Sequence, residues 1–489
     1  MKASRSRSLL ASTLAGAGMF ALVLPVAHAV PSYARQTGMA CSTCHTVFPE
    51  LTPFGREFKL NGYVLDNMKQ IKGITVERTE TMSLNQIPPL SLMAQISYNH
   101  TSQAVPDTTN PLAHAQAGEA DFPQQVSFFY AGKIADGLGA FMQLTYSGPG
   151  DHFGIDNTDI RYARHFSLAA APDSELIAGL TLNNNPTVQD AWNTTQAWGY
   201  PFSGSAVVPI PMTSTKLDSG AGGIGQNAVG LGGYVWYEHS IYGELTLYTG
   251  QKVGGTHPLD SSQTPLMRGV NPYWRLAYER RWDQNSFEVG TFGIRAAIHP
   301  SIVVVPATPD TVDTSTTPPT VVPGTPAQML PLSGPTDKYT DYGLDAQYQF
   351  ITDDHQLSAL ATYIHENQSL DASFKFGAAA NSSDSLNTEK LGINYYYRRK
   401  IGGSVGFFNT TGSTDTGLYG AAPVTGSASG SPSSRGYVFE LNYLPFLNTK
   451  LQLQYVAYSR FNGGSSNYDG SGRSASDNNT LYVLAWFNF

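Results

Sequence analysis

Apolar and polar residues alternate with a period of two in many segments of residues 90–489. In 449–459, for example, leucine and tyrosine alternate with Gln452 and Gln454. Because successive side chains of a strand point to opposite faces, this pattern is typical of β-strands with one apolar and one polar face. It predicts sixteen strands, at 90–99, 124–133, 138–147, 157–165, 174–181, 229–238, 241–250, 271–280, 285–297, 340–350, 356–365, 388–397, 401–410, 434–443, 449–459 and 479–489.

The connections between these predicted strands distinguish a membrane barrel from a soluble sandwich. Those after even-numbered strands are short, whereas those after odd-numbered strands are long and rich in Ser, Thr, Gly, Pro and Asn: 100–123, 182–228, 298–339, 366–387, 411–433 and 460–478. Outer-membrane barrels have short periplasmic turns and long extracellular loops. The aromatic stretch that ends at Phe489 resembles the C-terminal signal of such barrels. The predicted fold class is therefore all-β, a transmembrane β-barrel of about sixteen antiparallel strands.

The N-terminus has the three parts of a secretory signal peptide, which we place at residues 1–29. A basic start is followed by an apolar stretch over 9–26 and by an Ala-His-Ala cleavage site at 27–29. The alternative, a transmembrane anchor, is disfavoured by the Gly, Ser and Thr interruptions and by the cleavage site. A signal peptide directs export to the periplasm or beyond. The predicted barrel indicates that the protein lies in the bacterial outer membrane, in contact with its lipid.

Composition limits the partners and the contents of the barrel. Without the leader, 26 basic and 37 acidic residues give a formal charge of −11, which argues against nucleic acid and suits cations or basic proteins. A barrel of this size leaves a water-filled lumen unless other parts of the chain occupy it. The Pro/Thr-rich stretch 298–339 is of low complexity and is predicted to be a flexible surface loop.

Both cysteines of the chain lie in the sequence Cys41-Ser42-Thr43-Cys44-His45. This is the attachment pattern of a c-type haem, in which two thiols reach the vinyl groups on one porphyrin edge and the next imidazole turns back onto the iron. The alternatives are a stray dithiol, a zinc site and a thioredoxin-like site. Zinc would need further Cys or His ligands nearby, and a thioredoxin-like site would need a βαβ unit. The motif therefore predicts one haem c on Cys41 and Cys44, with His45 as the proximal ligand of the iron.

A short helix is predicted directly after the motif. Thr52 and Pro53 suit its N-cap and first position, and Gly62 suits its end. Phe54 and Phe58 share one face, where they could pack against the haem or simply form core. Three cations could pair with the haem propionates or remain solvated: Arg35, Arg56 and Lys59.

The sequence leaves the distal ligand of the iron open. Met68 is the first choice, because it follows the predicted helix at a reachable separation. Met93, on the polar face of the first strand, is the second, and a vacant or water-filled site is the third. Met39 is too close to Cys41 to reach round the porphyrin, and His100 falls on the outward face of its strand.

These patterns divide the chain into a signal peptide (1–29), a haem-binding segment (30–89) and the barrel (90–489). A segment of about 60 residues is marginal as an independent domain. Because the first strand starts on the periplasmic side, the segment starts there too. We therefore expect this short helical mono-haem segment to enter the barrel from the periplasmic side and partly plug the lumen.

The stretch YARQTGMACSTCHTVFPELTPFGREFKLNGY, followed by a barrel of about 400 residues, resembles the single-haem porin–cytochrome c fusions of iron-oxidising bacteria. The close match covers about residues 31–65, and the barrel is similar in architecture and length only. The resemblance implies an outer-membrane protein that takes electrons from extracellular Fe(II). It also implies that Cys41 and Cys44 are the thioether positions and that His45 is the proximal ligand.

The predicted function is electron transfer from an extracellular donor through the haem to a periplasmic cytochrome or similar carrier. Fe(II) is the first candidate for the donor. Such a one-electron Fe(II):cytochrome c oxidoreductase needs no acid–base catalysis. One alternative is a diffusion porin with a haem plug or sensor, and another is outward electron transfer to an extracellular acceptor. Acidic residues that could concentrate Fe²⁺, or could be ordinary solvated loop charges, are Asp107, Glu119, Asp121, Asp151, Asp156 and Asp159.

Overall fold

The structure is a computed structural model, which describes residues 31–46, 48–72, 83–105, 117–168, 171–187, 189–195, 203–218, 221–250, 266–305, 310–313, 315, 320–324, 328–331 and 333–489. The predicted signal peptide and Asp107 lie outside these described residues.

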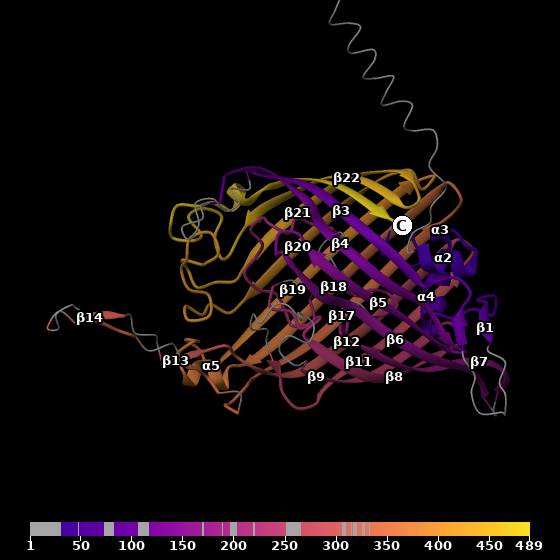
Figure 1. Cartoon of the computed structure of the whole chain (residues 1–489), viewed down its shortest axis with the longest axis horizontal. Helices are drawn as coiled ribbons and strands as arrows, with labels where there is room; N and C mark the ends of the chain where they lie inside the picture. Colours follow the sequence, from indigo (N-terminus) through magenta and orange to yellow (C-terminus); the bar gives the residue numbers. More distant parts are fainter. Residues whose placement is uncertain are drawn as a thin grey trace, which may run out of the picture.

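A closed barrel of sixteen long antiparallel strands dominates the described part of the chain (Figure 1). Each strand pairs with its neighbours in sequence, and β23 pairs with β3 to close the ring, while the two-residue β10 (Leu266–Met267) adds to β12. All sixteen predicted strands are confirmed, with shifted ends. They are β3 (Leu90–Thr101), β4 (Ala117–Ala135), β5 (Leu138–Ser147), β6 (His152–Leu168), β7 (Ala171–Asn183), β8 (Ala228–Tyr237), β9 (Ile241–Gly250), β11 (Asn271–Trp282), β12 (Asn285–His299), β17 (Asp337–Ile351), β18 (His355–Ser369), β19 (Ser383–Tyr397), β20 (Ile401–Gly412), β21 (Ser434–Phe446), β22 (Thr449–Arg460) and β23 (Thr480–Asn488).

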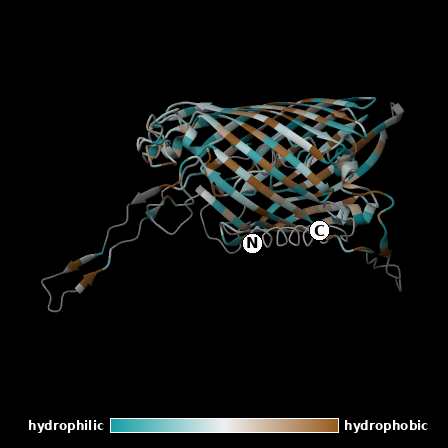
Figure 2. Cartoon of the chain, turned by 90° about the horizontal axis from the view of Figure 1, so that it is seen from above, coloured by the Kyte–Doolittle hydropathy of each residue, from teal (hydrophilic) through white to brown (hydrophobic). Residues whose placement is uncertain are grey.

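The barrel strands alternate between hydrophobic and hydrophilic residues (Figure 2). On β22, Leu451 and Leu453 are 41% and 44% exposed on the outside, whereas Gln452 and Gln454 face the lumen and are 2% and 1% exposed. The alternation therefore gives an apolar outer surface and a polar interior. A closed antiparallel ring with this distribution is the architecture of a bacterial outer-membrane barrel.

Among the connections that the structure describes, the predicted short–long alternation has one exception. Turns such as 136–137, 283–284 and 398–400 are short, but the connection between the third and fourth barrel strands, 148–151, is short as well. The prediction of a longer loop there is wrong, because the outward apolar positions continue back to Phe153 and β6 begins at His152. The Gly-Pro-Gly-Asp sequence then makes a tight turn, in which Asp151 has a positive φ of 48°.

The Pro/Thr-rich stretch 298–339 contains more structure than the predicted flexible loop. Two short ladders project from the long-loop end of the barrel (Figure 1): β13 (Val303–Val305) pairs with β16 (Gln328–Met329), and β14 (Thr311–Asp313) pairs with β15 (Thr320–Val322). Val312 and Val321 face each other across the outer ladder and are 60% and 61% exposed. At the same end lie the short helices α5 (Asp371–Lys375) and η1 (Ala475–Asn478).

Three short helices of the N-terminal segment lie in the opposite, short-turn end of the barrel (Figure 1). They are α2 (Pro31–Thr37), α3 (Cys41–Cys44) and α4 (Pro53–Leu60), and the two-stranded ladder β1 (Gln70–Lys72) and β2 (Ser83–Asn85) follows. Arg399, in the turn between β19 and β20, donates to the Ser42 hydroxyl at 3.0 Å. The prediction that the segment enters the barrel from the side of the short turns is confirmed.

The sequence explains where α4 begins and ends. The Thr52 hydroxyl accepts a hydrogen bond from the Gly55 amide at 3.1 Å, and Pro53 occupies the first turn, where its missing N–H costs nothing. Gly62 follows the helix with a φ of +70°, a conformation that glycine adopts without strain. The predicted helix is therefore confirmed at both ends.

A second part of the chain also fills the lumen. The connection between β7 and β8 is predicted as a long extracellular loop. Its described parts at 184–187, 189–195 and 203–218 fold inward, and we call them the inward loop. Trp192 is 2% exposed, and the Leu217 amide donates to Asp341 of β17 at 2.8 Å. On another side of the ring, the Ser203 hydroxyl donates to Gln452 of β22 at 2.7 Å. The loop therefore spans the lumen between distant strands.

Candidate functional site

The haem-attachment motif lines a cavity inside the short-turn end of the barrel. Cys41, Cys44 and His45 form part of its wall, and Phe54 and Phe58 of α4 form another part. β5, β6 and the inward loop supply a third part, which includes Phe141, Asn157, Thr158, Asp159, Asn185, Gln189, Asp190 and Asn193. The cavity holds about 1160 Å³ of space without protein atoms, some of it open to solvent.

His45 is prepared for metal ligation. Its Nδ1 lies 3.2 Å from the carbonyl oxygen of Pro49, a contact that assigns the proton to Nδ1 and leaves Nε2 available as a ligand. Burial lowers the pKa of the imidazole to about 4. The ring is therefore neutral at neutral pH, which is the form that binds a metal.

The two cysteines are held against α4. Burial raises the pKa of the Cys44 thiol to about 11. The backbone of α4 approaches the motif closely at Gly55. A Cβ atom there would lie 2.2 Å from the carbonyl oxygen of Cys44, so only glycine fits.

The barrel side of the cavity presents polar groups that lack partners. Asn157 Nδ2 and Asn193 Oδ1 are buried and have no hydrogen-bond partner among the described residues, although both side chains line the cavity. Leaving buried polar atoms unpaired costs free energy, so an occupant with polar edges fits this wall. Apolar aromatic rings beside the motif and polar groups opposite it suit a porphyrin, which has an apolar face and carboxylate edges. The residues present therefore fit a covalently bound haem.

Within the described residues, no group of three or more His, Cys, Asp and Glu side chains is arranged to hold a bare metal ion.

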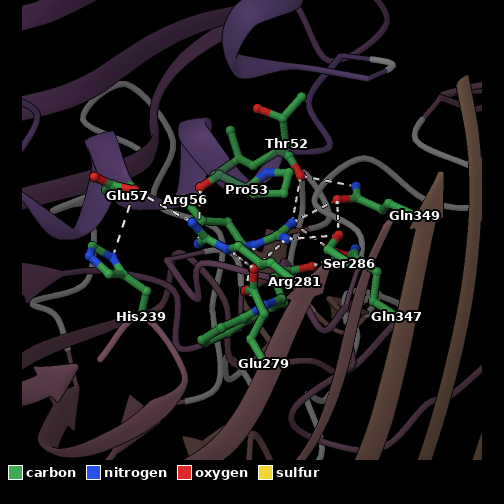
Figure 3. A network of polar contacts seen from close by, with 12 residues as sticks. Thr52, Pro53, Arg56, Glu57, His239, Glu279, Arg281, Ser286, Gln347 and Gln349 are labelled. Atoms are coloured by element: carbon green, nitrogen blue, oxygen red, sulfur yellow. Dashed lines mark hydrogen bonds and ion pairs between the residues drawn. The ribbon is translucent and has the colours of Figure 1, made fainter. Parts of the chain in front are cut away.

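A buried ion pair anchors α4 in the lumen (Figure 3). Arg56 Nε and Nη2 each donate to the Glu279 carboxylate of β11 at 2.9 Å, and the two side chains are 1% and 0% exposed. Arg56 Nη1 donates to Gln347 and Gln349 of β17 at 3.1 and 2.9 Å. Each nitrogen of the Arg56 guanidinium therefore donates to a side chain of the barrel wall.

The same carboxylate joins α4 to the inward loop. Glu279 also accepts hydrogen bonds from Trp192 Nε1 at 2.8 Å and from Arg281 Nε at 2.6 Å. Arg281 in turn lies 3.5 Å from Glu57 of α4, which is 3.8 Å from His239 in a short turn (Figure 3). The N-terminal segment, the inward loop and the strands β11 and β17 thus form one network around Glu279.

Glu50 is a second buried contact between the segment and the barrel. It is 0% exposed, and its carboxylate accepts from Gln349 at 2.7 Å and from Asn394 at 3.3 Å. Burial raises its pKa above the usual 4.5. Two amide donors only partly replace the water that an ionised carboxylate loses.

Glu50 should make docking of the segment weaker as the pH rises. Because its pKa is higher when docked, the docked state binds more protons, so docking is strongest below about pH 4.5 and weakens as the pH rises through the raised pKa. We expect Glu50→Gln to remove this pH dependence and to slow proteolysis of the segment at pH 7. Asp66→Asn, in the exposed stretch after α4, is the control. Equal pH dependence of proteolysis in both variants would contradict the role of Glu50.

The structure does not bring the predicted distal ligands to the cavity. Met68 is 3% exposed and packs with Phe58 and Tyr63, and its sulfur accepts a hydrogen bond from the Leu65 amide at 3.3 Å. Met93 packs in the barrel wall with Phe129 and Trp486. Neither methionine is among the residues that line the cavity. The structure therefore does not support Met68 or Met93 as the distal ligand of the iron.

Two residues that the sequence set aside behave differently from each other. Met39 lines the cavity although it lies two positions before Cys41. His100 is exposed on the outer face of β3, as predicted. The sequence excluded Met39 as a ligand on its short spacing from Cys41, but it could not place the side chain in the cavity wall, because that depends on the turn between α2 and α3.

Only one of the three predicted propionate partners lines the cavity. Lys59 does, and burial lowers its pKa to about 8. Arg56 instead forms the buried pair with Glu279, and Arg35 donates to the carbonyl oxygen of Leu90 at the barrel rim. Arg35 is exposed, in line with the solvated alternative, whereas the solvated alternative is wrong for Arg56, which is 1% exposed in its pair with Glu279.

Of the acidic residues suggested for Fe²⁺, those that the structure describes do not form an extracellular cluster. Glu119, Asp121, Asp156 and Asp159 belong to strands rather than loops, and only Asp151 lies in an exposed turn. Asp159 faces the cavity, where its carboxylate accepts from Tyr63 at 2.6 Å and from Arg161 at 2.7 Å. Its role is therefore to hold the N-terminal segment and the wall of the cavity together.

Sequence reasoning missed the inward loop as part of the site. The available signal was the stretch Asn183 to Asn193, which combines amides, an acid and a tryptophan, an unusual composition for an exposed loop. Its side chains supply four residues of the cavity wall, Asn185, Gln189, Asp190 and Asn193.

Within the part of the chain that the structure describes, no helix combines the length and the apolar character needed to cross a membrane.

No family model and no curated protein matches this chain. Solved structures that are similar include OmpF of Salmonella typhi in complex with daunomycin (12% identity, TM-score 0.43), the outer membrane channel DcaP of Acinetobacter baumannii (10%, 0.42) and an anion-selective porin from Comamonas acidovorans (11%, 0.41). Each match covers 82% of this chain and 97%, 96% and 98% of the other, respectively. At these identities and TM-scores the likeness adds nothing to the strand pairing, on which the fold assignment rests.

Proposed function

We propose that this protein carries single electrons across the bacterial outer membrane. The electrons would pass from an extracellular donor through a haem c on Cys41 and Cys44 to a periplasmic electron carrier. The donor that we propose is Fe(II). One observation carries the proposal: a complete haem-attachment motif lines a cavity inside a closed membrane barrel. A redox centre outside the barrel would be separated from one compartment by the roughly 25 Å of the apolar band.

When bound, the haem supplies one-electron exchange between Fe(III) and Fe(II). The residues of the chain hold and shield it. Cys41 and Cys44 fix one edge, and neutral His45 offers Nε2 to the iron. Phe54 and Phe58 exclude water from one side of the cavity. No residue needs to transfer a proton to the donor, since an electron alone moves.

The diffusion-porin alternative is less well supported. The N-terminal segment and the inward loop both hold buried contacts with the lumen wall, at Arg56–Glu279 and at Ser203–Gln452. Such contacts on opposite sides of the ring narrow the path for solutes. Outward electron transfer to an extracellular acceptor requires the same architecture, and the reduction potential of the haem relative to its partners decides between the two directions.

Covalent haem is the first testable consequence. We expect one haem per chain that survives denaturing electrophoresis, and complete loss of the haem stain in Cys41→Ser/Cys44→Ser. Ser42→Ala, within the same motif, is the matched control and should keep the stain. A chain purified from a host that attaches c-type haem, but carrying none, would contradict the proposal.

The electron path itself is tested in liposomes. The purified protein is inserted with its long loops outside, and Fe(II) is added outside only. We expect the spectrum of reduced haem to appear, and His45→Ala to lose it. Reduction by an internal but not by an external reductant, together with sugar permeation, would favour the diffusion porin and overturn the proposal.

A further inference from the structure

The cavity wall adjoins a buried cluster of charges that the electron-transfer path does not use. Arg275 of β11 is surrounded by three carboxylates: Asp190 of the inward loop, Glu288 of β12 and Asp345 of β17. Its Nε lies 3.2 Å from Asp190, and its Nη2 lies 2.9 Å from both Glu288 and Asp345. All four side chains are at most 5% exposed.

This cluster has more acids than one guanidinium can neutralise. Three ionised carboxylates around Arg275 would leave two negative charges in excess at a buried site, which is very costly. Moreover, Glu288 Oε2 is buried and has no hydrogen-bond partner among the described residues. An ionised oxygen in that position would be unstabilised, whereas a protonated one is tolerated. A proton bound by the cluster would relieve this excess of negative charge, and Glu288 Oε2 offers a position for it.

The cluster is close enough to the cavity to respond to charge there. Asp190 both contacts Arg275 and lines the cavity next to Asn193. In a site of low effective dielectric constant, one unit of charge in the cavity changes the energy of a neighbouring carboxylate strongly. The other charged groups that act on the cluster are Arg56 and Lys59 of α4 and Glu244 of β9, and the tyrosines beside it are Tyr242 of β9 and Tyr273 of β11.

We infer that reduction of the haem is coupled to uptake of a proton by the Asp190–Glu288–Asp345 cluster. This inference rests on the proposed haem. One electron from the reductant enters the cavity, and one proton from water forms an O–H bond on a carboxylate of the cluster, so that the buried charge stays constant. The reverse occurs when the periplasmic carrier removes the electron. The proton thus lowers the electrostatic cost of placing an electron next to buried acids.

The test is a redox titration of the purified holoprotein at several pH values between 5 and 8. Soluble mediators supply the electrons, so the result does not depend on any extracellular donor. We expect the reduction equilibrium to shift by up to tenfold per pH unit, which is about 59 mV for one electron. Glu288→Gln and Asp345→Asn should each reduce the slope. Asp354→Asn, in an exposed pair with Arg398, should leave it unchanged.

Two results would overturn the inference. One is a potential that does not change with pH in the unaltered protein. The other is an unchanged slope in both Glu288→Gln and Asp345→Asn, because the proton would then bind elsewhere, for example to the haem propionates. A chain that lacks haem altogether would overturn the proposed function as well, and the visible spectrum distinguishes that failure from a flat potential.

Discussion

Arg56→Met should release the N-terminal segment from the barrel. The substitution removes the guanidinium from a pair that is 1% and 0% exposed and leaves Glu279 with Arg281 and Trp192 only. Removing one partner of a buried ion pair costs about 3–5 kcal/mol. Because Arg281 and Trp192 still bind Glu279, we expect a value near the lower end of this range. About 3 kcal/mol corresponds to a more than hundredfold larger released fraction. Faster proteolysis of the segment and larger ion conductance in planar bilayers measure this effect.

Arg398→Met is the matched control for this experiment. Arg398 pairs with Asp354 at 2.8 Å, but the two side chains are 63% and 52% exposed, and exposed pairs contribute little. Proteolysis and conductance should therefore stay unchanged. If Arg56→Met behaved like this control, the lumen contacts of α4 would not hold the segment in place.

Gly55→Ala should destabilise the haem site although it adds a single methyl group. The new Cβ would lie 2.2 Å from the Cys44 carbonyl oxygen, so α4 has to move away from the motif. Overpacking of this kind costs about 1–3 kcal/mol, and a backbone neighbour cannot yield as a side chain does. The expected result is a lower midpoint for thermal loss of the Soret circular dichroism, with haem still attached.

Gly233→Ala separates this steric effect from the general effect of replacing glycine. Gly233 faces outward on β8, and its added Cβ would meet nothing closer than 3.8 Å. The Soret signal should melt as in the unaltered protein. Equal midpoints for the two alanine variants would show that the close approach of α4 to the motif has no energetic consequence.

The barrel could be predicted from the sequence because its pattern is local. Alternation such as that of Leu451 to Gln454 follows from the pleat of a single strand, which needs no knowledge of distant residues. The motif at Cys41 to His45 and the helix that begins at Pro53 are local as well, since spacing and capping specify them. Each of these features was confirmed in position, apart from the bound haem, which stays a prediction.

The rest of the site depends on contacts between residues far apart in the chain. Arg56 meets Glu279 more than two hundred residues later, and no local pattern distinguishes it from a solvated charge or a propionate partner. Met68 was favoured on separation alone, but the aromatic residues that bury it decide where its sulfur lies. The inward loop is polar enough to look extracellular, because the lumen that receives it is polar too.

The arrangement assigns separate tasks to the parts of the molecule. The apolar outer face positions the ring in the membrane, and the motif, α4 and the inward loop enclose the cavity. The motif lies near the short turns, as the contact between Ser42 and Arg399 indicates. Under the proposed function, a periplasmic carrier would have the shorter approach, and an extracellular donor would have to enter the lumen from the long-loop side.

The position of the iron tests the account most directly. An anomalous difference map, recorded at the iron absorption edge from crystals of the holoprotein, locates a single haem iron without assumptions about the chain. We predict one peak per barrel, inside the ring of strands, bonded to His45 Nε2 and between α4 and the inward loop. A peak outside the ring, or an iron bound away from His45, would contradict the account.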